Sequence, residues 1–385
     1  MDIAALRAEL RVLEHTAYFQ TGTLGPVPLT ALRAAQADLE RVNDAGPAHI
    51  PHRAPVMARI ETARGALCRL LGCSPAALGF TQNTTQAINL VALSVAWTPG
   101  DEVIITDGEH GANVQPWQRL AERRGVRLRV LPAADPEAVP ALVRAALGPR
   151  TRLVSLSHVS HLTGAVLPVA AVCALAQARG VLSLVDGAQA VGVLPVQVAE
   201  IGCDFYAGSG HKWLLGLPGT GYLYVRPETL PAFAPLWAGN GMGDIGDERL
   251  WSASARKIEI GTRDIAIPAA LTESLAFLQR AGGIAAIAAR VQGLRELLHA
   301  GLATLPGVQV LTPAGASGAA GLTTFHLTGG RGPALVDFLL DRHQVLVRQT
   351  GPTPDSIRVS THFFNTEAEV HQLLRGLREW LSAGF

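Results

Sequence analysis

Residues Val181–Val225 read VLSLVDGAQAVGVLPVQVAEIGCDFYAGSGHKWLLGLPGTGYLYV, and this stretch holds three short apolar runs separated by loops. Runs that are apolar on both faces are typical of strands in a parallel sheet that helices cover on both sides. The runs are Val181–Asp186, Asp204–Gly208 and Gly221–Val225. The first ends on an acid, and the second leads into Lys212. We therefore expect a carboxylate and an amine at the sheet edge where ligands bind.

The chain before this stretch alternates between strand-like and helix-like segments. The expected strands are Glu102–Thr106, Val126–Leu131 and Arg152–Ser157, and the expected helices are Asn113–Arg124, Pro136–Leu147 and Pro168–Arg179. Strands that alternate with helices in this way predict an α/β fold with a mostly parallel sheet.

The pattern changes after about residue 262. Two long helices are expected, Ile265–Arg280 and Ile284–Leu305, followed by shorter elements. These are strands Leu322–Leu327, Val345–Arg348 and Ile357–Ser360 and helices Pro333–Arg342 and Glu367–Ala383. We expect a large domain over residues 20–262 and a small α/β domain built from residues 1–19 and 263–385.

The composition excludes several classes of protein. Of the 385 residues, 48% are hydrophobic and 16% are charged, so the chain can bury a large core and retain apolar surface for a subunit interface. A formal net charge of +1 gives no electrostatic footprint for nucleic acid. No apolar run of about 18 residues is present to span a bilayer. The N-terminus, MDIAALRAELRVLEH, reads as a short amphipathic helix without the signal-peptide pattern, so we expect a cytoplasmic protein.

Lysine and cysteine are both rare in this chain. The only lysines are Lys212 and Lys257, so a mechanism that needs a lysine has two candidates. The four cysteines form no C-x-x-C pair and lie in apolar surroundings, so we interpret them as small buried hydrophobic residues. They are Cys68, Cys73, Cys173 and Cys203. No metal site is expected.

An amine and an acid at neighbouring strand ends match the needs of a pyridoxal-5′-phosphate (PLP) enzyme. Such an enzyme requires a lysine for a Schiff base, a carboxylate against the pyridine nitrogen, a flat group over the ring, a phosphate cradle and an arginine for the substrate carboxylate. Lys212 is the expected Schiff-base lysine and Asp186 the expected partner of the ring nitrogen. Gln189 is placed to hydrogen-bond the phenolic oxygen. Taken alone, Asp186 also fits a helix N-cap.

The remaining cofactor contacts are expected at other strand ends. TQNTTQ at Thr81–Gln86 precedes a helical pattern, so Thr84 and Thr85 are the expected phosphate donors at a helix N-terminus. Ser209 and His211 flank the lysine and are expected to donate to the same phosphate. His110, in DGEHGANVQPW, is the expected group over the ring. The alternatives are simple helix capping for the threonines and a loop-packed side chain for the histidine.

Four runs together resemble one known family. FTQNTTQAINLVA, EHGANVQPW, VDGAQAVG and SGHKWLLGLPGTGYLYV look like the cysteine desulfurase/class V aminotransferase family of fold-type I PLP enzymes. The resemblance extends from Tyr18 to about Val370. It implies a mostly parallel seven-stranded sheet in the large domain, and it implies the roles given above for the individual side chains. These are Lys212, Asp186, His110, Thr85, Ser209, His211 and Gln189.

The resemblance also implies contacts that the residues alone do not give. It implies a homodimer in which Gly261-Thr262 of one subunit reaches the phosphate of the other, whereas the sequence alone makes Thr262 an N-cap. It implies that Arg358 binds the substrate carboxylate, which a planar guanidinium does bidentately. Arg348, on the strand before it, is placed to assist, with a surface charge as its alternative.

The chain departs from the family at two places. Desulfurases carry a nucleophilic cysteine between the regions of Arg348 and Arg358, but here that stretch reads QTGPTPDS, and no cysteine follows Cys203. Persulfide transfer to a thiol at that place is therefore excluded. His161, in SHVSHLTG, stands where many members have asparagine; it could contact the phenolic oxygen or the substrate, or act as an acid–base group.

These features resemble the cystine C–S lyase branch and the isopenicillin-epimerase-like branches of the family. We expect a PLP-dependent β-lyase that removes sulfur from cysteine, cystine or a cysteine conjugate. A class V aminotransferase is the alternative, and an epimerase is a third reading. A PLP-binding regulator would be expected to lose Lys212 or Arg358 or to carry a DNA-binding segment, and this chain does neither.

Overall fold

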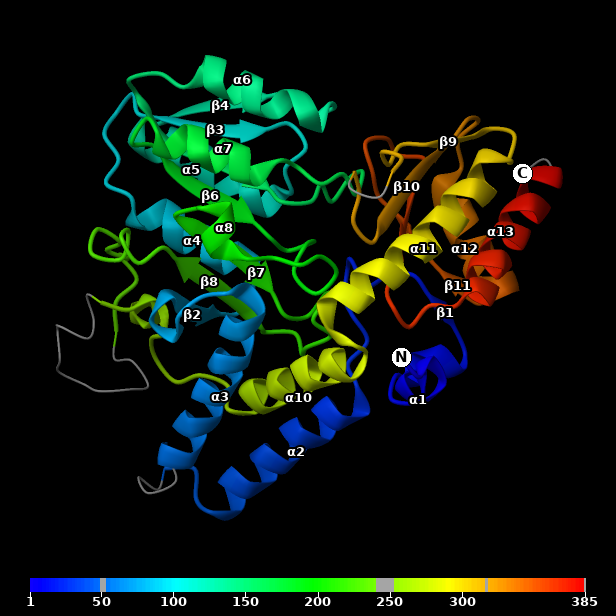
Figure 1. The fold of residues 1–385 in the computed structure, drawn as a ribbon, viewed down its shortest axis with the longest axis horizontal. Coiled ribbons are helices and arrows are strands. Elements are labelled where there is room, and N and C mark those ends of the chain that lie inside the picture. The colour runs from blue at the N-terminus through cyan, green and yellow to red at the C-terminus, as the bar shows by residue number, and fades with distance from the viewer. Residues whose placement is uncertain (49–52, 240–252, 316–317, 384–385) are drawn as a thin grey trace.

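A seven-stranded sheet forms the centre of the larger lobe in the computed structural model, which describes residues 1–48, 53–239, 253–315 and 318–383 (Figure 1). The strand order is β2-β8-β7-β6-β5-β3-β4, and only β8 runs antiparallel to its neighbours. The strands are β2 (Leu78–Thr81), β3 (Glu102–Thr106), β4 (Arg127–Leu131), β5 (Thr151–Ser157), β6 (Leu182–Asp186), β7 (Phe205–Ser209) and β8 (Gly221–Val225). The mostly parallel seven-stranded sheet is confirmed.

Helices cover both faces of this sheet. The covering helices include α4 (Thr84–Ser94), α5 (Gln115–Arg124), α6 (Val139–Ala146), α7 (Val169–Gln177) and α8 (Val198–Ile201). Consecutive residues of β3 enter different cores: Val103 and Ile105 pack in the cluster with α4 and α5, while Ile104 packs in the cluster with α6 and α7. Alternation of this kind explains why the strands are apolar throughout, since both of their faces are buried.

The six strands expected in this lobe are present, and their ends differ from the prediction by at most one residue. β2 was missed because its sequence, LGFT, is short and contains Gly79. That glycine is required by close packing, since a Cβ there would lie 2.5 Å from the carbonyl oxygen of Ala255.

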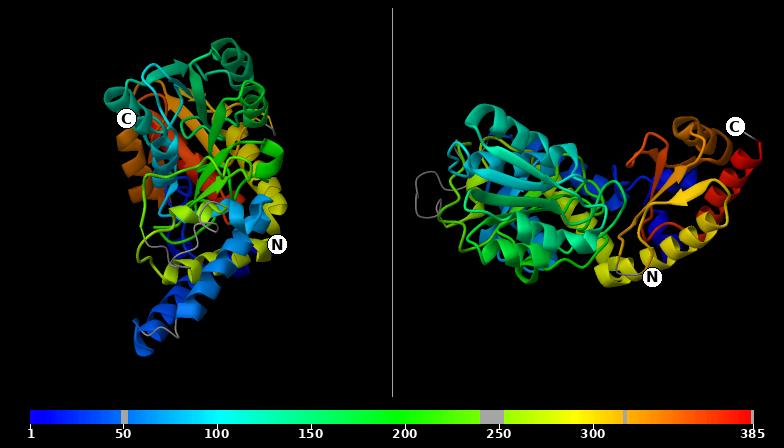
Figure 2. Two further views of the ribbon diagram at one scale, coloured as in Figure 1. Left: turned by 90° about the vertical axis from the view of Figure 1, so that its left-hand side faces the viewer. Right: turned by 90° about the horizontal axis from the view of Figure 1, so that it is seen from above.

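The smaller lobe is built on a four-stranded antiparallel sheet of order β12-β13-β10-β9. Its strands are β9 (Val308–Val310), β10 (Leu322–Leu327), β12 (Arg348–Gln349) and β13 (Ser356–Ser360), and its helices are α11 (Gly283–Ala303), α12 (Gly332–His343) and α13 (Glu367–Ser382). α13 begins with a capping box between Thr366 and Glu369. The right-hand view of Figure 2, seen from above, shows the two lobes side by side.

One expected strand of this lobe is divided between two sheets. The prediction of a single strand over Val345–Arg348 is wrong: β11 (Val345–Leu346) pairs in parallel with β1 (Ala17–Tyr18), whereas β12 pairs with β13. The N-terminal segment thereby joins the small lobe. Before it lie α1 (Ile3–Arg7) and a 3-10 turn, η1 (Arg11–Glu14), where one short helix was expected.

Three helices extend beyond the two sheets. α10 (Ala266–Arg280) packs on α2 (Leu29–Asp44) and α3 (Arg53–Leu71), and it buries Leu271 and Phe277 in the core of the larger lobe. The division into domains of residues 20–262 and residues 1–19 with 263–385 stays a proposal. No helix in the described ranges has the length and apolar character needed to cross a membrane.

Candidate active site

The carboxyl ends of the parallel strands bring the expected side chains to one edge of the large sheet. β6 ends at Asp186 and β7 ends at Ser209, three residues before Lys212. β3 leads into the loop that holds His110, and β2 leads into the N-terminus of α4. Ligands of open α/β sheets bind in the crevice at this edge.

Lys212 has an environment that favours its neutral amine. Burial lowers the pKa of Lys212 to about 8, an effect that the charge of Asp186 partly offsets and that Arg358 reinforces. The N-terminal segment contacts the loop of Lys212: Gly25 donates its N–H to the carbonyl of His211 at 2.8 Å. A Cβ on Gly25 would lie 2.1 Å from the Lys212 carbonyl oxygen, so only glycine fits there.

Lys257, the second lysine, is used for structure. Its buried Nζ donates to the carbonyl of Leu230 at 2.8 Å and to that of Phe233 at 2.6 Å, and it lies 5.5 Å from the centre of the Phe233 ring. These contacts occupy the amine, which leaves Lys212 as the lysine of the crevice.

Asp186 is buried next to this lysine. Burial raises the pKa of Asp186, while the Ala188 N–H, which donates to Oδ1 at 2.9 Å, and the charge of Lys212 act in the opposite direction. A buried carboxylate of this kind is stabilised by a cationic partner. The pyridinium nitrogen of PLP is such a partner.

A polar cluster at the N-terminus of α4 fits a phosphate group. Thr84 Oγ1 and Ser209 Oγ are 2.6 Å apart, and the N–H of Thr84 donates to Ser209 Oγ at 3.3 Å. His211 Nδ1 is buried without a hydrogen-bond partner, so it can donate to an anion when it carries the ring proton. The structure leaves Thr85 exposed on the first turn of the same helix.

Thr262 forms none of the hydrogen bonds described for this cluster. It is exposed in the loop between a 3-10 turn, η6 (Ala255–Ile258), and α10. The N-cap role that the sequence alone suggests for Thr262 is wrong, because Asp264 Oδ1 accepts from the N–H groups of Ala266 and Ile267.

His110 and His161 meet edge to face, with ring centroids 4.9 Å apart. The His110 ring is exposed, and its Nδ1 accepts from the N–H of Ala112 at 3.1 Å. Burial lowers the pKa of His161 to about 3, with His110 and Arg358 adding to the effect. The ring of His161 is therefore neutral at physiological pH, which argues against the acid–base role considered for it.

Two arginines converge on a residue from the N-terminal segment. Arg358 and Arg348 are cross-strand partners in β13 and β12, and they donate to Thr23 Oγ1 at 2.9 Å and 3.1 Å respectively. Arg358 also donates to the carbonyl of His161 at 3.1 Å, and its Nε is buried without a partner. Among the described residues neither arginine forms an ion pair. Burial lowers the pKa of Arg358 to about 10, so its guanidinium still carries its charge at neutral pH. Two adjacent cations without an acid form a site for a carboxylate.

Gln189 is fixed by two neighbours that sequence reasoning did not single out. Its Oε1 accepts from Trp213 Nε1 at 2.8 Å, and its Nε2 donates to the carbonyl of Gly22 at 2.9 Å. The second N–H of its amide remains for the phenolic oxygen expected from the sequence. Thr23 was also missed, because nothing local in the run YFQTGTLGPVP relates it to the two arginines.

Glu109 is a further residue that the sequence analysis passed over. Its buried carboxylate accepts from Thr106 Oγ1, Asn113 Nδ2 and both the N–H and Oγ of Ser157, at distances between 2.5 and 3.0 Å. It precedes His110 directly, so these bonds fix the backbone from which His110 projects. No local signal marked Glu109, because the burial that makes its partners necessary is set by the tertiary structure.

The side chains at this edge together fit PLP. The cofactor requires an amine, an acid, phosphate donors and a flat group. Lys212 with its lowered pKa, the buried Asp186, the Thr84 and Ser209 hydroxyls near the free Nδ1 of His211, and the exposed His110 ring fit these needs. Within the described ranges no group of three or more His, Cys, Asp or Glu side chains could hold a metal ion.

The chain belongs to the aminotransferase class-V family, whose model matches residues 18–373. It is therefore a PLP-dependent enzyme of that class. It is 36% identical over 373 residues to isopenicillin N epimerase of Streptomyces clavuligerus, covering 93% of each chain. It is also 36% identical to a cysteine desulfurase of Klebsiella pneumoniae, covering 84% of this chain and 83% of the relative.

The similarity extends to solved structures of C-DES, a cystine C–S lyase. The complex of C-DES with its reaction product cysteine persulfide has a TM-score of 0.88 at 30% identity, over 96% of this chain and 98% of that chain. A C-DES mutant with glycine covalently linked to the PLP cofactor has a TM-score of 0.89 at the same identity and coverage.

Proposed function

We propose that this enzyme is a C–S β-lyase that eliminates sulfur from cysteine, cystine or a cysteine S-conjugate. One observation carries the proposal: Lys212, beside Asp186 at the carboxyl end of the large sheet, lies close enough to the arginine pair of the small lobe to be affected by its charge, while the loop between the two arginines contains no thiol. β-Elimination needs the first set of groups and no enzyme thiol. The likeness to C-DES supports the same conclusion.

The arginines would bind and orient the amino acid. The Arg358 guanidinium, turned toward the crevice by its bonds to Thr23 and His161, would receive the substrate carboxylate, with Arg348 beside it. Lys212 would hold the cofactor and then remove the proton from Cα, a role for which an amine of lowered pKa is suited. Bound PLP supplies the electron sink that stabilises negative charge at Cα.

The groups around the cofactor would tune this chemistry. Asp186 would keep the ring nitrogen protonated, and His110 would cover the ring. Thr84, Thr85, Ser209 and His211 would bind the phosphate, and Gln189 would contact the phenolic oxygen. The C–S bond then breaks and a thiolate leaves; His161 is held neutral, so the thiolate would take its proton from water.

The positions of the cysteines argue against a desulfurase mechanism that uses a thiol of the loop. Cys68, Cys173 and Cys203 are buried, and Cys73 is half-buried, all in the larger lobe. The loop Gln349–Ser356 contains no cysteine, and near its end Thr353 and Ser356 hydrogen-bond to each other.

A product screen tests the proposal. Cystine and S-substituted cysteines should yield pyruvate, ammonia and a sulfur product without any keto acid, and replacement of all four cysteines by serine or alanine should leave this activity. Lys212→Ala should abolish it, together with the absorbance band of the covalently held cofactor. Turnover that requires a keto acid and forms its amino acid would instead establish an aminotransferase. Loss of activity on replacing a single cysteine in a folded variant would restore the desulfurase reading.

Epimerisation at Cα is the second candidate, favoured by the 36% identity to isopenicillin N epimerase across almost the whole chain. An epimerase returns the proton to the other face of Cα, whereas a lyase loses the β-substituent. Chiral analysis of recovered amino acids, run beside the pyruvate assay, separates the two reactions.

We further propose that the enzyme is a cytoplasmic homodimer in which Gly261-Thr262 reaches the phosphate site of the second subunit. The segment before it is firmly anchored: Arg64 forms a two-pronged ion pair with Glu259, at 2.6 and 3.0 Å, and Glu259 also accepts from the N–H of Phe80 at 2.7 Å. The exposed Thr262 would then project from a fixed base. Sedimentation analysis tests the dimer, and PLP binding by Thr262→Ala tests the contact with the second subunit. That variant should stay dimeric and bind PLP more weakly.

A further inference from the structure

We propose that the pocket between the two lobes receives the sulfur substituent of the substrate, and that the enzyme therefore prefers cysteine S-conjugates with an extended, largely apolar group. This inference rests on the proposed function and names its substrate class. The pocket encloses about 650 Å³, a size typical of sites for small organic molecules and far larger than a cysteine side chain requires.

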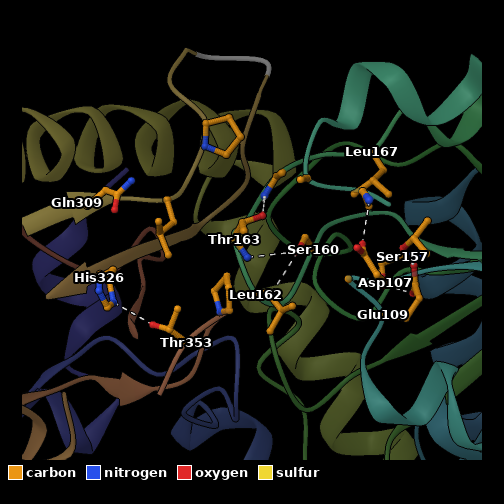
Figure 3. Close-up of a pocket in the computed structure, with 18 residues that line it drawn as sticks. Asp107, Glu109, Ser157, Ser160, Leu162, Thr163, Leu167, Gln309, His326 and Thr353 are labelled. Atoms are coloured by element: carbon orange, nitrogen blue, oxygen red, sulfur yellow. Dashed lines mark hydrogen bonds between the residues drawn. The ribbon is translucent and has the colours of Figure 1, made fainter. Parts of the chain in front are cut away.

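The pocket is lined from both lobes, as Figure 3 shows. Asp107, Glu109 and Ser157 lie on the side of the large sheet, at the ends of β3 and β5. His326 of β10 and Thr353 lie on the opposite side. The loop that contains Ser160, Leu162 and Thr163 runs between them.

The pocket adjoins the crevice through two loops. Gly108 and Glu109 line the pocket, and the next residue is His110. Ser160 and Leu162 line it as well, and between them stands His161, whose carbonyl accepts from Arg358 and whose ring contacts His110. A substrate whose carboxylate lies on Arg358 is thus bound beside the wall of the pocket, within reach of a long substituent.

The lining suits an uncharged chain. Apolar side chains form much of the wall, and no lysine or arginine is among the described residues that line it. The apolar residues are Ala133, Ala134, Leu162, Ala165, Leu167, Leu311, Pro313 and Pro352. The buried Glu109 carboxylate has its bonds to Thr106, Asn113 and Ser157 within the protein. His326 Nδ1 and Thr353 Oγ1 are paired at 2.9 Å. Asp107 is exposed to solvent and accepts from the N–H of Ala133 at 2.9 Å. An apolar substituent would therefore be buried without leaving a buried carboxylate unsatisfied.

The pocket is fixed by bonds between the lobes. Val166 donates to the carbonyl of Gly318 at 3.1 Å, and Ala320 donates to the carbonyl of Gly164 at 3.1 Å. These backbone bonds hold the 160–166 loop of the larger lobe against the smaller one. A pocket formed in this way before binding loses little conformational entropy when a ligand enters.

A series of 3-(alkylthio)propionates, which are thioethers with a free carboxylate, tests the inference without turnover. These compounds keep the carboxylate and the thioether chain but lack the amino group, so the holoenzyme cannot process them. Calorimetry from S-methyl to S-hexyl should show the dissociation constant falling about threefold to fourfold per methylene, the gain from burying one such group. A dissociation constant that is independent of chain length would overturn the inference.

A pocket variant and a matched control localise the effect. Thr163→Phe fills the pocket and should reduce the ratio between the S-methyl and S-hexyl dissociation constants to near unity. Thr62→Phe, the same change at an exposed residue of α3, should leave the wild-type ratio. If Thr163→Phe keeps that ratio, the substituent binds elsewhere. Because this readout needs no catalysis, it can succeed even if the product screen rejects a lyase, and it can fail while the lyase stands.

Discussion

At the scale of the residue, Lys212 links burial to cofactor uptake. Only a neutral amine attacks an aldehyde, and the lowered pKa of about 8 makes about a tenth of Lys212 neutral at pH 7 and about nine tenths at pH 9. We expect the rate at which the apoprotein binds PLP covalently to rise with pH through about pH 8. Stopped-flow absorbance against pH measures it; a midpoint near the ordinary lysine pKa of 10.5 would contradict the burial argument.

Arg358 carries the second prediction at this scale. Arg358→Ala should weaken apparent substrate affinity by about 2–5 kcal/mol, the range for removing one partner of a buried charge pair. Arg358→Lys should recover only part of it, since an ammonium cannot bind a carboxylate with two parallel bonds. PLP occupancy, read from absorbance, should hardly change in either variant. Unaltered kinetics in the alanine variant would move the carboxylate site to Arg348.

At the scale of the element, Glu109 ties two strand ends to the loop that presents His110. Thr106 ends β3, Ser157 ends β5, and Asn113 closes the 3-10 turn η4 (Gly111–Asn113). In Glu109→Gln the new amide NH₂ would face groups that themselves donate hydrogen bonds. A buried polar group left unsatisfied in this way costs about 1–3 kcal/mol.

We therefore expect Glu109→Gln to lower the free energy of unfolding by about that amount and to shift the absorbance maximum of the bound cofactor, because His110 loses its fixed position. Denaturant unfolding and spectroscopy measure the two effects. Glu137→Gln, at an exposed acid, serves as the control. A stability loss with an unshifted spectrum would limit Glu109 to a structural role.

At the scale of the whole molecule, Gly164 marks the junction of the two lobes. It has a φ of +77°, and a Cβ there would lie 2.4 Å from the carbonyl oxygen of Leu322 in the other lobe. Gly180 has a φ of +65° with nothing within 4 Å of its Cβ position. A comparison of alanine substitutions at Gly164 and Gly180 separates the cost of left-handed backbone from the cost of the steric clash between the lobes.

Gly180→Ala should cost only the left-handed backbone strain, about 1–2 kcal/mol. Gly164→Ala should cost more and should also raise KM, because the 160–166 loop, which positions Arg358 through His161, must move away from the smaller lobe. Thermal unfolding and steady-state kinetics compare the two variants. Equal losses of stability with equal KM values would show that the junction does not control the site.

The sequence by itself determined most strands of the large sheet and the positions of Asp186 and Lys212 after two of them. Apolar runs of strand length follow from burial on both faces, and such runs can be read locally. Asp186 and Lys212 follow their strands within a few residues, so the topology of a parallel sheet is enough to place them together. The same reasoning could not find β2, since LGFT carries too little local signal.

Only the tertiary structure decided which distant segments complete the site. Thr23, Arg348 and Arg358 meet through two sheets and the N-terminal segment, and no local periodicity relates them. The neutral state of His161 depends on burial by residues far away in sequence. The pocket depends on backbone bonds between lobes, which join residues 166 and 318. Long-range packing sets these features because they are contacts between elements, whereas each strand and its terminal residue are encoded side by side in the chain.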